Sequence, residues 1–241
     1  MQEFNTIHTS RTIMFSELSQ VMNRGMDTAD FNNILQLNVA NKLSNSNLIK
    51  TNRYLKQLYQ LDISDLPFRC FQHYWKLSDD NCKPILSLLF AINNDTLLRE
   101  SVDLVVSSPL KEKIPIEKFD ENIENFHPGR YSANTRRSAA QNIASSWKQA
   151  GYIEGKVRSI RIEPGQTYQT VAFAFLLSYL NGERGDFILT SKVVKALAIE
   201  NEKVRDLIRQ AATHDLVQYQ HGGNVTVISF ENQLNQIHNG Q

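Results

Sequence analysis

Seven basic side chains and one acidic side chain lie between residues 130 and 161, although the whole chain is almost neutral. The chain carries 26 Lys and Arg residues against 25 Asp and Glu residues, so its net charge is only +1. Clustered cations neutralise nucleic-acid phosphates and release condensed counterions, which gives affinity that does not depend on sequence. The cluster therefore predicts a local phosphate-binding surface on a protein that is not basic overall. Its basic members are Arg130, Arg136, Arg137, Lys148, Lys156, Arg158 and Arg161.

A capped helix followed by a short β-ribbon is expected to position these side chains. Ser132 is a suitable N-cap for a helix over residues 133–150, and Gly151 is typical of the position just past a helix end. Apolar residues recur at spacings of three and four along one face of this helix, and residues 152–162 alternate as a β-ribbon does. The apolar stripe consists of Ala140, Ile143, Ala144 and Trp147.

The remaining face of that helix carries the groups that can contact DNA. Arg137, Gln141 and Lys148 fall opposite the apolar stripe, and Arg136 lies in the first turn. We expect these four to face a DNA duplex, while Lys156, Arg158 and Arg161 on the ribbon contact its backbone. Helix and basic ribbon together predict a first winged-helix-like unit.

Residues 187–230 predict a second unit of this kind. Thr190 or Ser191 opens one helix, a second amphipathic helix follows, and two alternating runs flank Gly222-Gly223. Helix, helix and β-hairpin in this order are typical of a winged helix. Acidic residues balance the basic ones on the second helix, so we expect this unit to pack against the rest of the chain or to bind protein.

The N-terminal part predicts a helix-turn-helix-like unit. Residues 44–47 are polar and suit a helix end followed by an N-cap, and the next helix is expected over residues 47–61. Lys50, Arg53 and Lys56 lie largely away from its apolar face. Such a face can lie against phosphates, or it can be an ordinary solvated helix surface.

The overall pattern predicts a mainly α-helical fold of two domains. Short helices are expected over residues 68–77, 84–93, 96–107 and 116–126, and the apolar run 171–180 is expected to be a buried helix. The turn signal His127-Pro128-Gly129 suggests the boundary. We therefore expect a helical domain over residues 1–126 and a domain of winged-helix-like units with short β-hairpins over residues 127–241.

Signatures of catalysis are missing from the sequence. No zinc-protease, paired-cysteine, nucleotide-loop or nucleophile-elbow motif occurs, so we expect no enzymatic activity, no metal and no cofactor. His8, His73, His127, His214, His221 and His238 occur singly. Cys70 and Cys82 are expected to be reduced thiols, and no apolar run is long enough for a membrane span. These features favour a cytosolic location without membrane contact.

Two segments resemble the BrxA family, accessory proteins of bacteriophage-exclusion (BREX) systems. They are residues 41–62, which contain Lys-Thr-Asn-Arg-Tyr-Leu-Lys-Gln-Leu-Tyr-Gln-Leu-Asp, and residues 132–155, which contain Trp-Lys-Gln-Ala-Gly-Tyr-Ile-Glu-Gly. The resemblance loosely covers most of the chain in the order of its motifs and is weakest over residues 66–126. It implies a helical N-terminal half, a winged-helix C-terminal half and DNA binding without catalysis. It also implies partners among a methyltransferase, a phosphatase-like protein and ATPases of the same system.

The sequence therefore favours a protein that binds double-stranded DNA with weak sequence specificity. Two alternatives remain open. One is a protein-protein adaptor whose basic surface meets an acidic partner, and the other is an RNA-binding helical module that uses residues 47–61. An A-form groove does not admit a recognition helix, so competition between duplex DNA and structured RNA separates the two kinds of nucleic acid.

Overall fold

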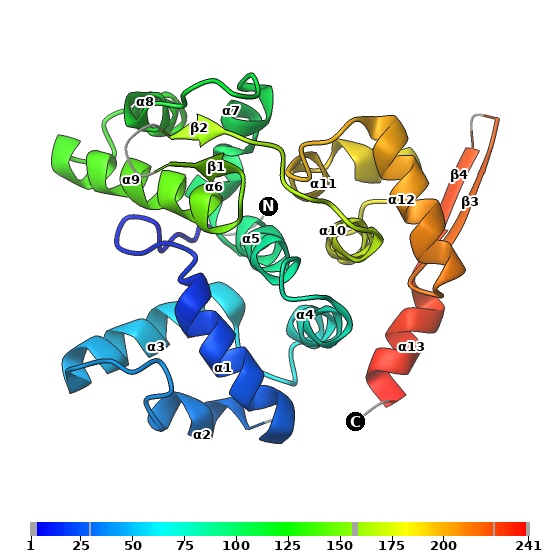
Figure 1. Cartoon of the computed structure of the whole chain (residues 1–241), viewed down its shortest axis with the longest axis horizontal. Helices are drawn as coiled ribbons and strands as arrows, with labels where there is room; N and C mark the ends of the chain where they lie inside the picture. Colours follow the sequence, from blue (N-terminus) through cyan, green and yellow to red (C-terminus); the bar gives the residue numbers. More distant parts are fainter. Residues whose placement is uncertain (1–3, 29, 156–158, 224, 240–241) are drawn as a thin grey trace.

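The computed structural model describes residues 4–28, 30–155, 159–223 and 225–239, most of which are in α-helices (Figure 1). The helices of the first half are α1 (Phe15–Thr28), α2 (Phe31–Gln36), α3 (Asn45–Tyr59), α4 (Leu66–Leu77), α5 (Lys83–Asn94), α6 (Thr96–Glu100), α7 (Val102–Ser107) and α8 (Ile116–Phe126). Those of the second half are α9 (Ala133–Gln149), α10 (Tyr168–Leu180), the 3-10 helix η1 (Gly185–Thr190), α11 (Lys192–Lys195), α12 (Asn201–Thr213) and α13 (Glu231–Asn239). The strands form two antiparallel hairpins, β1 (Ile153–Glu154) with β2 (Ile160–Arg161) and β3 (Gln218–Gly222) with β4 (Val225–Ser229). The prediction of a mainly helical fold with short hairpins is confirmed.

Side-chain caps set several helix boundaries where the sequence predicted them. The Ser132 hydroxyl accepts from the Thr135 amide at the start of α9, and Ser191 caps α11 in the same way. Local backbone geometry sets the start of α1 at Phe15. The Thr12 hydroxyl accepts from the Met14 amide, and Met14 has a φ of 50°, which a right-handed helix cannot include.

The segment predicted as one helix over residues 96–107 is two helices. Ser101 lies between α6 and α7, where its hydroxyl donates to the Leu98 carbonyl at 2.7 Å. The same hydroxyl accepts a hydrogen bond from the indole Nε1 of Trp147 at 2.8 Å. The helix therefore breaks where the chain meets a side chain of α9, which the local sequence pattern does not reveal.

The central helices α4, α5 and α10 lie side by side in the middle of the molecule (Figure 1). Every residue of α10 from Gln169 to Ser178 is buried, so the prediction of a buried helix over this run is confirmed. Phe71 of α4, Phe90 of α5 and Phe173 of α10 pack together, with ring centroids 4.9 Å to 6.5 Å apart. Among the described helices, none is both long and apolar enough to cross a membrane.

The peripheral elements pack around this centre. Helix α8 lies along α9, α12 lies against α10, and α13, which the sequence analysis did not predict, returns to α4 (Figure 1). Buried apolar residues form one cluster that extends from Ile7 to Ile237 and therefore crosses residues 127–130. The division into domains over residues 1–126 and 127–241 stays a prediction.

The helix-turn-helix and winged-helix details are not confirmed. Residues 37–44 separate α2 from α3, whereas the turn of a helix-turn-helix has three to four residues. The order α11, α12, β3 and β4 matches the predicted second unit, and Gly223 has a φ of 59°, as a tight hairpin turn favours. The helix-and-hairpin outline is present, but the assignment of either unit as a winged helix stays a prediction.

A buried polar network attaches the N-terminal segment to the rest of the fold. His8 Nδ1 lies 2.9 Å from Asp95 Oδ2, and His8 Nε2 lies 2.9 Å from Ser146 Oγ on α9. Asp95 also accepts from the amides of Ile7 and Leu98, so one carboxylate caps α6 and holds the N-terminal segment. All three side chains of the network are almost completely buried.

The balance of forces on Asp95 favours its charged form. Burial alone raises the pKa of this carboxyl, but the charge and hydrogen bond of His8 and the two amide donors lower it by more. The pKa of folded Asp95 therefore lies below its ordinary value of 3.8. The contribution of ionised Asp95 to the stability of the fold is complete above the ordinary pKa of this carboxyl. It is lost as the pH falls through the lowered pKa of the folded state.

Asp95→Asn is expected to lower the free energy of unfolding by about 3 kcal/mol at neutral pH, because it removes one charge of a buried pair. It should also remove the part of the acid sensitivity that Asp95 causes. Urea unfolding at several pH values between neutrality and the acid transition measures both effects. Asp80→Asn is the control, since the Asp80 side chain is 96% exposed in its ion pair with Lys83 and should matter little. Equal stability of Asp95→Asn and the wild type contradicts this account.

Candidate nucleic-acid interface

The predicted contact helix α9 buries the face that the sequence indicated. Ala140, Ile143, Ala144 and Trp147 all lie in the core. On the opposite face, Arg137 and Gln141 are exposed. Lys148 is half-buried, and its Nζ donates to the carbonyl of Gly155 at 2.6 Å. The helix therefore presents fewer free cations than its sequence contains.

Arg136 is held by carboxylates of the neighbouring helix α8. Its Nε lies 2.8 Å from Asp120 Oδ2, and its Nη1 forms a second ion pair with Glu124. The hydrogen bond that Arg136 donates to Asp120, together with the charges of both carboxylates, raises the pKa of Arg136. The guanidinium is therefore already compensated by two anions before any phosphate approaches.

The surface between α8 and the start of α9 is acidic rather than basic. A cavity of about 440 Å³ lies there, with three carboxylates and two guanidinium groups in its wall. Like charges repel, so this part of α9 disfavours a phosphate backbone. The charged lining residues are Glu117, Asp120, Glu121, Arg136 and Arg137.

Arg161 is buried, which corrects the prediction that it contacts a nucleic-acid backbone. Its side chain is only 2% exposed, and its guanidinium donates to the carbonyls of Val105, Tyr152 and Ile162. Burial lowers the pKa of this arginine. A strand of two residues is too short for its pattern to indicate which side faces the core. In the structure, Arg161 attaches the ribbon to α7.

The other members of the basic cluster are dispersed. Arg130 is exposed, and its guanidinium lies 3.7 Å from the centroid of the Phe4 ring, a cation–π arrangement. Lys156 and Arg158 lie outside the described residues. The cluster that is continuous in the sequence is therefore divided in space between a cation–π contact, ion pairs and a buried site.

Helix α3 presents the predicted second set of cations on its surface. Lys50, Arg53 and Lys56 are all exposed, while Leu55 and Leu58 on the other face are buried. No acidic residue occurs in the sequence from residue 31 to residue 61. Lys56 Nζ donates to the neutral Asn32 Oδ1 at 2.7 Å, so this contact leaves its charge uncompensated.

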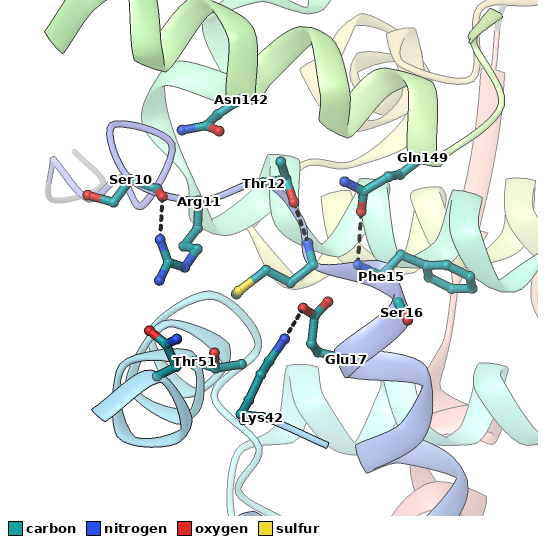
Figure 2. A pocket seen from close by; sticks show the side chains of 12 residues that line it. Ser10, Arg11, Thr12, Phe15, Ser16, Glu17, Lys42, Thr51, Asn142 and Gln149 are labelled. Atoms are coloured by element: carbon teal, nitrogen blue, oxygen red, sulfur yellow. Dashed lines mark hydrogen bonds and ion pairs between the residues drawn. The ribbon is translucent and has the colours of Figure 1, made fainter. Parts of the chain in front are cut away.

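A polar cavity of about 630 Å³ lies beside the first turns of α3 (Figure 2). We call it the α3 cavity. Its walls come from the N-terminal segment and from α1, α3 and α9, with one further residue, Lys42, from the connection before α3. The lining residues are Ser10, Arg11, Thr12, Met14, Phe15, Ser16, Glu17, Lys42, Asn47, Thr51, Asn142 and Gln149.

Arg11, which was not among the predicted contact residues, links the α3 cavity to the cationic face of α3. Its guanidinium lies 5.3 Å from the centroid of the Tyr54 ring, and that of Arg53 lies 4.7 Å from the same ring. A hydrogen bond with Ser10 and the charges of both arginines lower the pKa of the Tyr54 phenol, against the opposing effect of burial. No periodic pattern surrounds Arg11 in the sequence, so no local signal indicated its position.

The buried network of Asp95, His8 and Ser146 has the connectivity of a hydrolase triad, so its accessibility decides whether it is a site. All three residues have 0% exposure. The Ser146 hydroxyl also accepts from the Ile13 amide at 3.0 Å and donates to the Asn142 carbonyl at 2.8 Å. A substrate cannot reach this hydroxyl in the described conformation, so we assign the network a structural role. In the described part of the chain, no three His, Cys, Asp or Glu side chains are placed to hold a metal ion.

Comparison with known proteins adds no assignment. No protein-family model, curated protein or solved structure matches the chain. Functional inference therefore rests on the charges and cavities described above.

Arg161→Met is expected to lower the free energy of unfolding by about 2 kcal/mol or more, because buried carbonyls lose their donors. Urea unfolding followed by circular dichroism measures the change. Arg137→Met is the matched control, since Arg137 is exposed on α9 and its replacement should change stability little. Similar stabilities of the two variants would show that Arg161 does not fasten the ribbon.

Proposed function

We propose that this chain is a non-catalytic protein that binds double-stranded DNA, with α3 as its main phosphate-contacting surface. The observation that carries the proposal is the exposed row Lys50, Arg53 and Lys56 within an acid-free segment over residues 31–61. We therefore assign the main phosphate contact to α3 and not to α9 and its ribbon.

The spacing of the row suits a phosphate backbone. Residues at i, i+3 and i+6 lie within an arc of about 120° and span about 9 Å along the helix axis. Three cations on one face can contact successive phosphates and release their counterions. Arg11 lies beside this row and extends it toward the α3 cavity.

On α9, by contrast, the charge available to DNA is smaller. Arg136 is paired with Asp120 and Glu124, and Arg161 is buried. Arg137 and Gln141 remain exposed, so we assign α9 a secondary contact. Phosphate contacts position a protein without reading bases, so the proposed binding has weak sequence specificity.

The biological setting of the proposal rests on the resemblance to the BrxA family alone. It is an accessory role in a bacterial anti-phage defence system of the BREX type. The corresponding partners are a methyltransferase, a phosphatase-like protein and ATPases of the same system.

A protein-protein adaptor is the second candidate function, and one observation favours it. Leu37, Leu43 and Ile49 expose 57%, 104% and 61% of their side chains around the start of α3. Exposed apolar residues that form a contiguous patch are typical of docking surfaces. If this surface docks a protein, Leu43→Ser with Ile49→Ser should abolish co-purification of that protein and leave DNA affinity unchanged.

The triple variant Lys50→Ala, Arg53→Ala, Lys56→Ala is expected to weaken binding to duplexes of any sequence alike. The slope of log affinity against log salt concentration should fall by about three units, because each phosphate contact contributes about 0.9. Fluorescence anisotropy with two unrelated duplexes across salt concentrations measures this slope, and structured RNA as competitor tests the RNA-binding alternative.

The matched control is the double variant Arg137→Ala, Lys148→Ala on α9. It should lower the slope by no more than about one unit. Circular dichroism establishes that both variants fold. A larger effect of the α9 variant would return the interface to α9, and no wild-type binding at low salt contradicts the proposal as a whole.

A further inference from the structure

We propose that the α3 cavity binds a single nucleotide, whose phosphate pairs with Arg11 and whose base edge meets side chains of α3 and α9. The inference deepens the proposed function, because the nucleotide is either an unpaired unit of the DNA bound on α3 or a free mononucleotide. Both sources share one chemistry, a phosphate joined to a polar aromatic base. A volume of about 630 Å³ lies within the range of small-molecule sites, about 300 to 1,000 Å³.

The cavity contains polar groups that the protein leaves without partners. Thr51 is 4% exposed and lines the cavity, yet its hydroxyl makes no hydrogen bond to the described residues. The Asn47 side chain likewise makes none within the described ranges. Asn142 uses its Nδ2 to donate to the His8 carbonyl at 2.9 Å, which leaves its Oδ1 free of described partners. Asn47 is exposed and Asn142 is half-buried, so their free groups and the Thr51 hydroxyl at the cavity wall can bond a ligand that has both donors and acceptors.

Other lining residues are fully used by the fold. Gln149 accepts from the Phe15 amide at 3.0 Å and donates to the Ser145 hydroxyl, so it fixes the start of α1 against α9 (Figure 2). Met14 has a φ of 50°, a conformation that L-residues adopt rarely and that is often found at binding sites. The N-terminal segment is therefore held in an unusual path around the cavity.

The charge of the cavity suits one phosphate. Lys42 Nζ lies 2.6 Å from Glu17 Oε1, so these two charges cancel (Figure 2). The Arg11 guanidinium has one described hydrogen bond, from Nη1 to the neighbouring Ser10 carbonyl at 2.9 Å. Its remaining donors suit two oxygens of a phosphate, since a guanidinium binds oxyanions in a bidentate manner.

The position of Arg11 connects the cavity to the proposed backbone path. Arg11 and Arg53 lie over the same Tyr54 ring, so a phosphate contacted by Arg53 is close to one contacted by Arg11. A strand that follows α3 can therefore place one nucleotide at the cavity. Asn side chains at the wall have the paired donor and acceptor that recognise base edges.

Isothermal titration calorimetry of the full chain with the four deoxynucleoside monophosphates tests the inference. We expect at least one of them to bind more tightly than inorganic phosphate and than its own deoxynucleoside, because the site holds both parts. Arg11→Gln should weaken this binding at least about tenfold, the value of one charge-assisted bidentate contact. Thr51→Val and Asn142→Leu should each weaken it several-fold.

Two controls separate the cavity from the α3 face and from folding defects. Arg24→Gln removes an exposed arginine of α1 outside the cavity lining and should leave nucleotide affinity within about twofold. Urea unfolding reports whether each variant folds. Arg11→Lys retains the charge without the planar fork and should bind more weakly than the wild type but more tightly than Arg11→Gln.

DNA with a single-stranded overhang, compared with a blunt duplex, distinguishes the two sources. If the nucleotide belongs to bound DNA, the wild type prefers the overhang and Arg11→Gln loses that preference. If it is a free nucleotide, the mononucleotide binds and the preference is absent.

The absence of binding by every mononucleotide at millimolar concentration, together with no overhang preference, overturns the inference while duplex binding leaves the proposed function intact. Mononucleotide binding without duplex binding supports the inference about the cavity and contradicts the proposed binding of double-stranded DNA. Arg11→Gln binding as tightly as the wild type also overturns the assignment of the phosphate to Arg11.

Discussion

The buried carboxylate of Asp95 is the constraint on which the arrangement around α3 depends. It accepts hydrogen bonds from the N-terminal segment and from the first turn of α6, and it pairs with His8. His8 in turn reaches Ser146 on α9. A charged group without these partners is costly to bury, so the N-terminal segment, α6 and α9 stabilise one another. The N-terminal segment, which has no regular structure of its own, acquires a fixed path in this way.

That path places the candidate site. Arg11 follows His8 by three residues and lies between α3 and α9, and Gln149 holds the next residues at the start of α1. The α3 cavity is therefore a product of the same contacts that stabilise the fold. Because the supporting side chains are buried, the polar groups that face the cavity are presented from a rigid surround, which suits recognition of a ligand.

Charge pairing decides which cations remain available. The sequence between residues 130 and 161 is basic, but α8 brings Asp120 and Glu124 to Arg136, and the core takes Arg161. In the described part of the chain, Lys50, Arg53 and Lys56 of α3 form no ion pair, although Lys42 before α3 pairs with Glu17. The segment around α3 is less basic in sequence than residues 130–161, but its cations form the more exposed surface.

The sequence by itself determined the features that depend on neighbours along the chain. The Ser132 cap, the apolar stripe of α9, the hairpin at Gly222-Gly223 and the buried helix α10 all follow from local hydrogen bonding and periodicity. Only the tertiary structure decided the burial of Arg161, whose partner Val105 is 56 positions away, and the break between α6 and α7 at the indole of Trp147. It also decided the placement of Arg11 and His8, which no local pattern marks. The physical reason is that capping and periodicity act over a few residues, whereas desolvation and charge pairing depend on groups brought together by the fold.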